Sequence, residues 1–255
     1  MARRLGTLKV FDGPVHSVWA RGKYCFFVSD GSLYRRIAGA NVLVTSDIGD
    51  SQMYYELMFN KCYMSNGSVR LIVDDSSVTA WVANVPTQVQ SDKRVLGIVS
   101  DFTRLCVHAG RMFVQKGNGI WQSEPGNPGC FNLGSGPMSF GELGDFVSVG
   151  NGMYVSCEDG VVFLEGAAKE DFVRKNVYSK SAIPGTLCVV NGTDIEDSQE
   201  FFGNTAAWVS SDGVCFGDAR GFVKNKTSRS LEFDTASVGA AVALPGKYFF
   251  SLEVA

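Results

Sequence analysis

Residues 23–36 read KYCFFVSDGSLYRR, two short apolar runs joined by Asp30-Gly31. In an extended chain, alternate side chains of the YCFFV run point to opposite faces, and here both faces are apolar. Asp-Gly supplies the positive φ angles that a tight hairpin turn requires. The stretch therefore predicts two adjacent antiparallel strands, the first of them covered on both faces.

A similar sequence motif occurs four more times along the chain. The later copies are KCYMSNGSVRLIV (61–73), RMFVQKGNGIWQS (111–123), GMYVSCEDGVVFL (152–164) and AAWVSSDGVCFG (206–217). Most copies follow another apolar or aromatic stretch, and these upstream stretches are residues 16–19, 53–57, 104–107 and 145–149. We expect an Asp-Gly or Asn-Gly turn in each copy, at 66–67, 118–119, 159–160 and 212–213. Each unit then predicts strand, turn, strand, turn and strand.

Radially repeated antiparallel sheets at this period predict an all-β fold, a β-propeller of about six three- to four-stranded blades. The unequal spacing of the units excludes a strict solenoid, and we expect one domain over residues 1–255 with inserted inter-blade loops. A sixth, shorter unit follows as Ala236–Leu244 and Lys247–Val254. A β-sandwich or an open repeat array is compatible with the same pattern.

Other local patterns concern the ends and the insertions. The N-terminal stretch Gly6–Phe11 is expected to pair with the last blade and so close the ring. Helical periodicity is nearly absent, and the best helical candidates are Ala167–Val173 and Glu196–Phe202, of one or two turns at most.

The composition bounds the class of protein. Only 19 % of the 255 residues are charged, while Phe, Tyr and Trp number 18, 8 and 4, which suggests that a partner covers part of the surface. The net charge of −3 lacks the excess of basic residues that is typical of nucleic-acid-binding proteins. We interpret the pairs Arg3-Arg4 and Arg35-Arg36 as solvated surface. We expect no secretory signal, and no apolar run approaches the ~18 residues of a membrane span.

Cysteine usage points to a reducing compartment. The seven cysteines are an odd number and contain no C-x-x-C pair. Several lie inside strand-like runs, so we expect reduced, mostly buried thiols in a protein made in a cytosol.

The sequence contains no recognisable catalytic arrangement. His16 and His108 lack cysteines at zinc spacing and a nucleophile motif nearby, so both are interpreted as structural. Residues 194–200 (DIEDSQE) do not match a calcium loop and are interpreted as a solvated insertion, and Asp74-Asp75 as a turn. Sialidase, WD, kelch and phosphate-loop signatures are absent. We expect no catalytic residue, no cofactor and no metal site, and hence a protein that is not an enzyme.

The segment WQSEPGNPG (121–129) is the most distinctive loop, because two prolines and two glycines define its shape. A preshaped loop on a propeller face is a candidate docking site. The candidate docking residues are Trp121, Glu124, Pro125, Asn127 and Pro128. The alternative interpretation is a rigid connector between two blades.

Several segments together resemble virion proteins of tailed bacteriophages. They are DGPVHSVWARGKYCFFVSDGSLYRR (12–36), MYYELMFNKCYMSNG (53–67), WQSEPGNPGCFNL (121–133), AIPGT (182–186), AAWVSSDGVCFGDARGFVKNKTS (206–228) and VGAAVAL (238–244). Similar proteins include β-propeller components of the tail nozzle, also described as packaged-DNA stabilisation proteins, of short-tailed phages. The resemblance covers residues 12–244 and involves no chemical site.

The resemblance implies a structural role in the tail, with assembly in the host cytoplasm. The expected partners are further copies of the chain in a hexameric ring, the head-to-tail adaptor and other tail proteins. Double-stranded DNA is expected to pass without specific contacts, which a mildly acidic wall allows, and no membrane insertion is expected. The alternative is a receptor-binding or glycan-degrading propeller of the tail tip, since fold analogy alone does not choose between them.

Overall fold

The computed structural model describes residues 11–86, 94–195, 201, 203–228, 230–233 and 236–254. The predicted pairing of Gly6–Phe11 and the helix predicted over Glu196–Phe202 lie, except for Phe11 and Phe201, outside these residues. The chain divides into two compact units, Met1–Trp81 and Val82–Ala255. The expectation of one domain over residues 1–255 stays a prediction.

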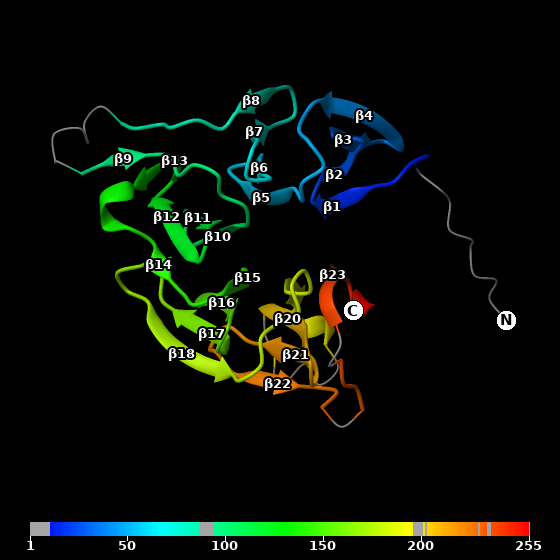
Figure 1. The fold of residues 1–255 in the computed structure, drawn as a ribbon, viewed down its shortest axis with the longest axis vertical. Coiled ribbons are helices and arrows are strands. Elements are labelled where there is room, and N and C mark those ends of the chain that lie inside the picture. The colour runs from blue at the N-terminus through cyan, green and yellow to red at the C-terminus, as the bar shows by residue number, and fades with distance from the viewer. Residues whose placement is uncertain are drawn as a thin grey trace. The chain divides into compact units, whose positions relative to one another are not determined.

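The first unit contains two four-stranded antiparallel sheets, drawn in blue and cyan in Figure 1. The first sheet, in the order β1-β2-β3-β4, has β1 (His16–Arg21), β2 (Tyr24–Ser29), β3 (Ser32–Ile37) and β4 (Ala40–Thr45). The second, in the order β5-β6-β7-β8, has β5 (Tyr54–Met58), β6 (Lys61–Ser65), β7 (Arg70–Val73) and β8 (Val78–Ala80). Strands that follow each other in sequence are neighbours, as short hairpin turns dictate.

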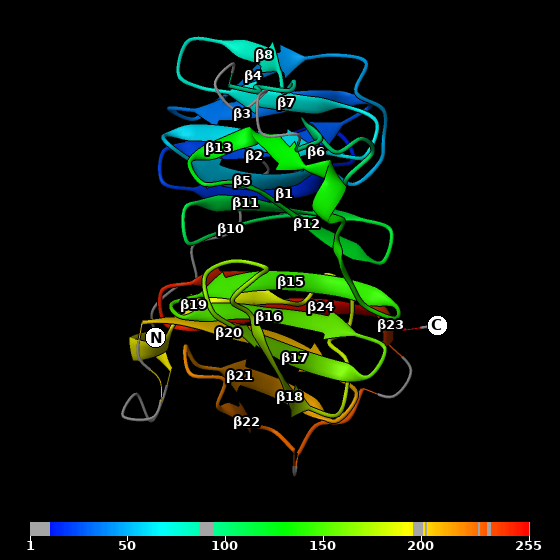
Figure 2. The ribbon, with the colours of Figure 1, turned by 90° about the vertical axis from the view of Figure 1, so that its left-hand side faces the viewer.

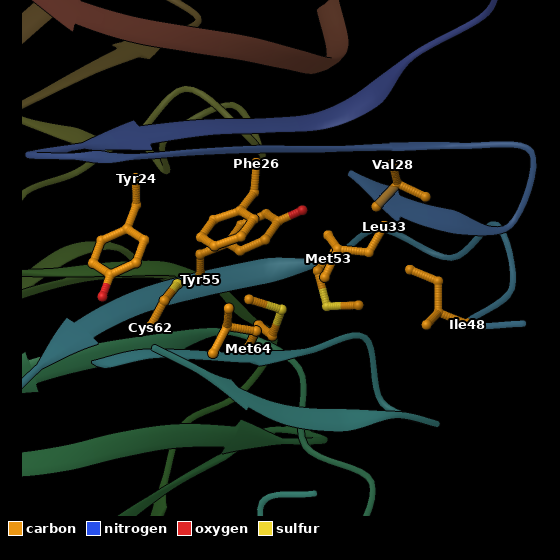
Figure 3. Packing of buried hydrophobic residues seen from close by; sticks show 10 residues of the cluster. Tyr24, Phe26, Val28, Leu33, Ile48, Met53, Tyr55, Cys62 and Met64 are labelled. Carbon is orange, nitrogen blue, oxygen red and sulfur yellow. The ribbon is translucent and has the colours of Figure 1, made fainter. Parts of the chain in front are cut away.

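The core of this unit lies between its two sheets. Figure 3 shows Phe26 of β2 beside Tyr55 of β5, with ring centroids 5.9 Å apart and nearly parallel planes. On the opposite face of β2, Phe27 stacks on Tyr34 of β3 at 5.4 Å. Strand β2 is therefore covered on both faces, as its sequence predicts.

The second unit contains three sheets of four or more strands and a two-stranded hairpin (Figure 1). The first sheet has six strands: β9 (Leu96–Gly97), β10 (Leu105–His108), β11 (Arg111–Lys116), β12 (Gly119–Glu124), β13 (Asn127–Asn132) and β14 (Met138–Ser139). The other two have four each: β15 (Leu143–Val149), β16 (Gly152–Cys157), β17 (Gly160–Glu165) and β18 (Val173–Tyr178), then β19 (Cys188–Asn191), β20 (Asn204–Ser210), β21 (Gly213–Gly217) and β22 (Val223–Asn225). The hairpin consists of β23 (Ala236–Leu244) and β24 (Lys247–Val254).

Neighbouring sheets of the second unit pack face to face. Figure 2 shows β15, β16, β17 and β18 one beside the next. Tyr154 of this sheet contacts Trp208 of the next, with ring centroids 5.8 Å apart. The Tyr154 hydroxyl donates to the carbonyl of Asp218 at 2.7 Å, and Gly217 is required beside it because a Cβ there would lie 2.4 Å from the tyrosine ring.

The expectation of about six blades is wrong by one. The sixth unit forms only the β23–β24 hairpin, and this hairpin packs on the β19–β22 sheet through a cluster that includes Ile183, Val209 and Phe250. Within the described residues, five sheets have four or more strands. The two strands of the hairpin have one face that packs on the β19–β22 sheet, through Tyr248, Phe250 and Leu252. The hairpin therefore covers that sheet and does not form a further blade.

Two kinds of local prediction also need correction, the position of three turns and one helix. The turn Asp30-Gly31 has the predicted positive φ angles, 47° and 66°, and the turn predicted at 66–67 is confirmed, with Gly67 at φ 90°. In the last three copies the turn lies one residue earlier than predicted, as at Glu158-Asp159, and Gly160 begins the next strand at φ 117°. A glycine there restores the pairing after a turn that would otherwise splay the strands. The helix predicted over Ala167–Val173 is wrong, because residues 166–171 form bends and turns and β18 begins at Val173.

The cysteines are free thiols, five of them buried and Cys25 and Cys188 partly buried. Burial raises the pKa of the Cys62 thiol to about 12, so this group is unreactive at neutral pH. Among the described residues, no helix is both long and apolar enough to span a membrane.

Candidate functional site

The candidate docking segment is a β-hairpin within one sheet. Trp121 and Glu124 belong to β12, and Asn127 and Pro128 belong to β13, with Glu124 directly opposite Asn127. Pro125-Gly126 form the turn, with Gly126 at φ 67°. The hairpin is preshaped, as predicted, whereas its alternative interpretation as a connector between two blades is wrong.

Most polar groups of this hairpin already have partners within the chain. Glu124 accepts from Arg94 at 2.9 Å, and the Asn127 amide donates to the carbonyl of Asn84 at 2.8 Å. Pro128 is buried, Trp121 is half-buried and Pro125 is exposed. A docking role of the five predicted residues stays a prediction, and the tip Pro125-Gly126 is the part left open for it.

Gln122, on the same strand, ties the hairpin to the turn at residues 166–171. Its side-chain carbonyl accepts from the backbone nitrogen of Lys169 at 2.8 Å, and its amide donates to both carboxylate oxygens of Glu170. This donation lowers the pKa of Glu170. The Lys169 ammonium in turn donates to the carbonyl of Ser135 at 2.6 Å. These bonds connect β12 to the turn, and the turn to the segment that follows β13.

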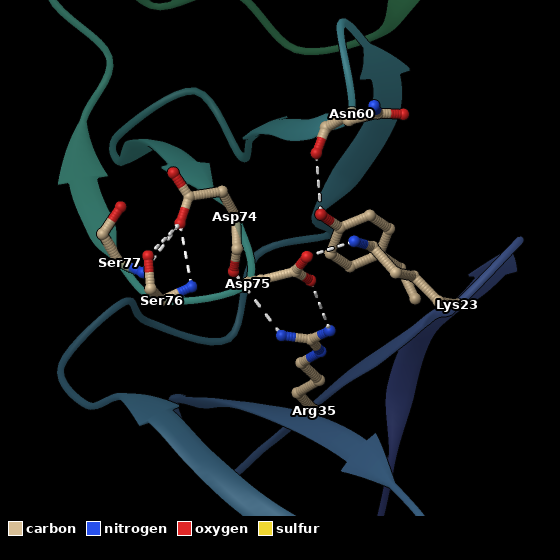
Figure 4. A network of polar contacts seen from close by, with 8 residues as sticks. Lys23, Arg35, Asn60, Asp74, Asp75, Ser76 and Ser77 are labelled. Atoms are coloured by element: carbon tan, nitrogen blue, oxygen red, sulfur yellow. Dashed lines mark hydrogen bonds and ion pairs between the residues drawn. The ribbon is translucent and has the colours of Figure 1, made fainter.

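The first unit has a polar network that includes the predicted Asp74-Asp75 turn, which is confirmed (Figure 4). Asp74 Oδ1 accepts from the backbone nitrogens of Ser76 at 2.9 Å and Ser77 at 2.8 Å. These bonds stabilise the ionised carboxylate and lower the pKa of Asp74 to about 2. The turn is an Asx-type structure, and Asp74 is fully engaged in it.

Asp75 lies across from two basic side chains of the first sheet. Lys23 forms a short ion pair with it, and Arg35 approaches it at 3.5 Å (Figure 4). The Lys23 hydrogen bond lowers the pKa of Asp75. Arg35 also stacks over the ring of Tyr24, 4.8 Å from its centroid. The charges of this network therefore join the two sheets of the first unit.

Both histidines have hydrogen-bond partners. His16 Nδ1 lies 2.7 Å from the hydroxyl of Ser17. His108 is buried, with Nδ1 at 2.9 Å from the hydroxyl of Ser148 and Nε2 at 2.7 Å from the carbonyl of Gly166. Since a carbonyl only accepts, Nε2 carries the proton and Nδ1 accepts from Ser148. Burial lowers the pKa of His108.

A hollow of about 290 Å³ lies between the β19–β22 sheet and the hairpin. Its lining includes Asn191, Asp194, Phe216, Leu244, Lys247 and Tyr248. One carboxylate and one ammonium with apolar neighbours define no reaction. Asp194 and Ile195 are the described part of the predicted insertion 194–200, and its remainder lies outside the described residues. Within the described ranges, no three His, Cys, Asp or Glu side chains are grouped as metal ligands.

Phe59 is a feature that sequence reasoning missed. It occupies the β5–β6 hairpin turn with Asn60, at φ 52° and 57°, and its side chain is 61 % exposed. A bulky residue in the left-handed region is uncommon, since asparagine and glycine adopt it at lower cost. The signal available beforehand was the unusual FN pair between two strands.

Comparison with known proteins identifies the architecture. No protein-family model and no curated protein sequence matches the chain. A gluconolactonase from Xanthomonas campestris superposes over 90 % of this chain and 79 % of its own, with a TM-score of 0.55 and 8 % identity. The Neurospora crassa Pan2 WD40 domain superposes over 89 % of this chain and 69 % of its own, with a TM-score of 0.53 and 10 % identity.

The fold is that of a β-propeller with five blades. At these identities the likeness concerns the fold alone. Kluyveromyces lactis Hsv2 is similar in the same sense, with a TM-score of 0.51, 12 % identity, and coverage of 86 % of this chain and 63 % of its own. Enzymatic and non-enzymatic propellers are thus both among the similar structures.

Proposed function

We propose that this protein is a structural component of a bacteriophage tail, a subunit of the nozzle ring. In this role it attaches below the head-to-tail adaptor, retains packaged DNA and conducts it during ejection. The observation that carries the proposal is the set of segments between residues 12 and 244 that resemble tail-nozzle proteins. The β-propeller fold is the one that this resemblance implies.

The resembling segments make structural contacts, which supports a structural role. In AIPGT (182–186), the nitrogen of Ala182 donates to Ser156, the nitrogen of Ile183 to the carbonyl of Val209, and the nitrogen of Gly185 to Asp145. These bonds connect the chain between β18 and β19 to both flanking sheets. The motif therefore stabilises the packing of sheets.

Charge is consistent with DNA passing without being held. The net charge is −3, and the basic side chains Lys23, Arg35 and Arg104 are each paired with a carboxylate. Affinity for DNA grows with each phosphate that a protein neutralises. Pairing of cations with carboxylates reduces the number that can bind phosphate, which favours sliding of the duplex.

We also propose that the protein is not an enzyme. His108 has acceptor and donor partners on both ring nitrogens, and Asp74, Asp75 and Asp145 are engaged in turns or ion pairs. Hydrolysis of a glucono-lactone by the purified chain would contradict this part of the proposal. A catalytically active gluconolactonase assayed in parallel is the control.

The decisive experiment is electron cryo-microscopy of virions that contain this chain. Several copies in a closed ring around the DNA channel, next to the adaptor, are the expected result. Density confined to spikes or the distal tip would overturn the nozzle proposal and favour receptor binding or glycan degradation. Labelling the chain with a small inserted tag at Gly117, an exposed turn residue, identifies its density.

A further inference from the structure

Strand β4 is an unusual sheet edge. The outermost strand of a sheet exposes unpaired backbone groups. Such a strand is normally short or carries charges that prevent further pairing. Among the described sheets, β8 and β22 have three residues each, and β18 carries Arg174 and Lys175. β4 has six residues, ANVLVT, without charge or proline, and exposes 46 % of Val42 and 54 % of Leu43.

Strand β24 offers a second edge of this kind. In the described part of the chain its backbone pairs with β23 and with no other strand. Its inward side chains Tyr248, Phe250 and Leu252 pack on the neighbouring sheet, whereas Phe249 and Ser251 are exposed. Directly across the hairpin, Val242 opposes Phe249 and is exposed as well. A further strand on this edge would extend the hairpin to three strands, which stabilises a sheet with an apolar face.

The charges at the ends of the two strands are complementary. Arg36 contacts Asn41 at the start of β4 with a distance of 2.8 Å, and Asp47 follows its end. β24 begins at Lys247 and reaches Glu253. Asn41 and Asp47 are six positions apart, as are Lys247 and Glu253, which is roughly 20 Å at about 3.3 Å per residue.

Only the antiparallel alignment of β4 with β24 brings opposite charges together. It brings Arg36, which bonds Asn41 from the neighbouring strand, toward Glu253, and Asp47, just past the bulge in β4, toward Lys247. A parallel alignment brings like charges together, which is unfavourable. In this register Leu43 lies opposite Ser251. The extra residue of the bulge in β4 lies at Val44, so Ala40–Leu43 keep regular pairing geometry.

We propose that β4 of one copy of this chain pairs antiparallel with β24 of a second copy, forming a continuous sheet across the two subunits. The two edges are different surfaces, so each copy has one of each free for a further neighbour. Such a heterologous contact generates a ring when its rotation closes. The inference rests on the proposed function, because it names the subunit contact of that ring.

The first test is cross-linking in trans with the full chain. A Leu43→Cys variant is mixed with a Ser251→Cys variant and oxidised, and a disulfide-linked pair of one chain of each kind is expected. The control mixes Val173→Cys, at the exposed β18 edge, with Ser251→Cys and should yield no such pair. The proposal is overturned if the mixed pair does not form. It is also overturned if a Leu43→Cys/Ser251→Cys chain forms its disulfide only within one chain.

The second test uses charge reversal and mass photometry. Arg36→Glu and Glu253→Arg should each reduce the oligomeric fraction at least several-fold, and the double variant should restore it. Circular dichroism confirms that each variant folds. A double variant no better than either single one contradicts the alignment. If microscopy places the chain in a nozzle ring but cross-linking fails, this contact is wrong and the proposed function stands. If the cross-linked rings form but are absent from the tail, the contact stands and the proposed function is wrong.

Discussion

The carboxylate of Asp145 accepts a hydrogen bond from the backbone nitrogen of Gly185 at 2.5 Å, joining β15 to the segment that leads into β19. The other oxygen of the same carboxylate forms a short ion pair with Arg104, and Asp145 is buried. One side chain thus connects three parts of the second unit that are up to 81 residues apart (185 minus 104).

Replacing Asp145 by Ala should therefore destabilise the protein strongly. The change removes the carboxylate that a mostly buried guanidinium and a backbone nitrogen share, which costs about 3 kcal/mol of unfolding free energy. Urea denaturation measures the change. The matched control is Lys175→Ala, which removes an exposed pair with Glu165 and should cost at most about 1 kcal/mol. Equal losses for the two variants would refute the structural role of Asp145.

Gly185→Ala should release the β23–β24 hairpin. Gly185 has φ 87°, and a Cβ there would lie 2.0 Å from the carbonyl oxygen of Gly239 in β23. Backbone strain at Gly185 and displacement of Gly239 together should lower the free energy of unfolding by more than about 2 kcal/mol. Limited proteolysis should cut the hairpin faster in this variant than in the unaltered protein.

Gly246→Ala is the control for backbone strain alone. Gly246 has φ 70°, yet a Cβ there meets nothing within 4 Å. The expected loss is about 1 kcal/mol, without faster cleavage of the hairpin. If both alanine variants behave alike, the contact between Gly185 and Gly239 does not hold the hairpin.

The Asp74 turn should weaken in acid. The folded-state pKa is lowered to about 2 from an ordinary value near 3.8, so the unfolded chain takes up the proton first as pH falls. The stabilisation from this carboxylate is complete above about pH 4 and is lost as pH falls toward about 2. The difference in Tm between the unaltered protein and Asp74→Ala should shrink over that range. A difference independent of pH would show that the ionised carboxylate is not what stabilises the turn.

His108 should make stability depend on pH at milder values. Its pKa is lowered by burial below the ordinary 6.5, so the unfolded state binds the proton more readily than the folded state. Stability should fall as pH decreases below about 6.5. Urea denaturation at pH 7.5 and 5.5 measures this fall, and His108→Gln should reduce it. His16→Gln is the control, and an equal reduction by that variant would argue against His108 as the cause.

Sequence reasoning succeeded where neighbouring residues decide the structure. The upstream stretches at 16–19, 53–57, 104–107 and 145–149 are confirmed as strands β1, β5, β10 and β15, except that Met53 and Arg104 lie one residue before β5 and β10. Asp30-Gly31 is confirmed as a turn, because its φ angles depend on local sterics. The pattern of alternating side chains likewise identified β2 as buried on both faces.

The same reasoning failed where distant residues decide. The hairpin of β23 and β24 has the sequence pattern of the other units, and only its packing against Ile183 and Val209 shows that it is not a sixth blade. The docking segment was recognised as preshaped, yet its partners Asn84, Arg94 and Glu170 are 30 to 48 residues away from the hairpin residues they bind. No local pattern encodes such pairs.

The sequence by itself determined an all-β chain of repeated antiparallel hairpins, since period-two burial and turn chemistry act between residues close in the chain. The tertiary structure decided the number of blades, the partners of Asp145 and His108, and which strands remain as open edges. Those features depend on which surfaces meet after the sheets have formed. Packing between segments far apart in the sequence selects them, and local propensity does not.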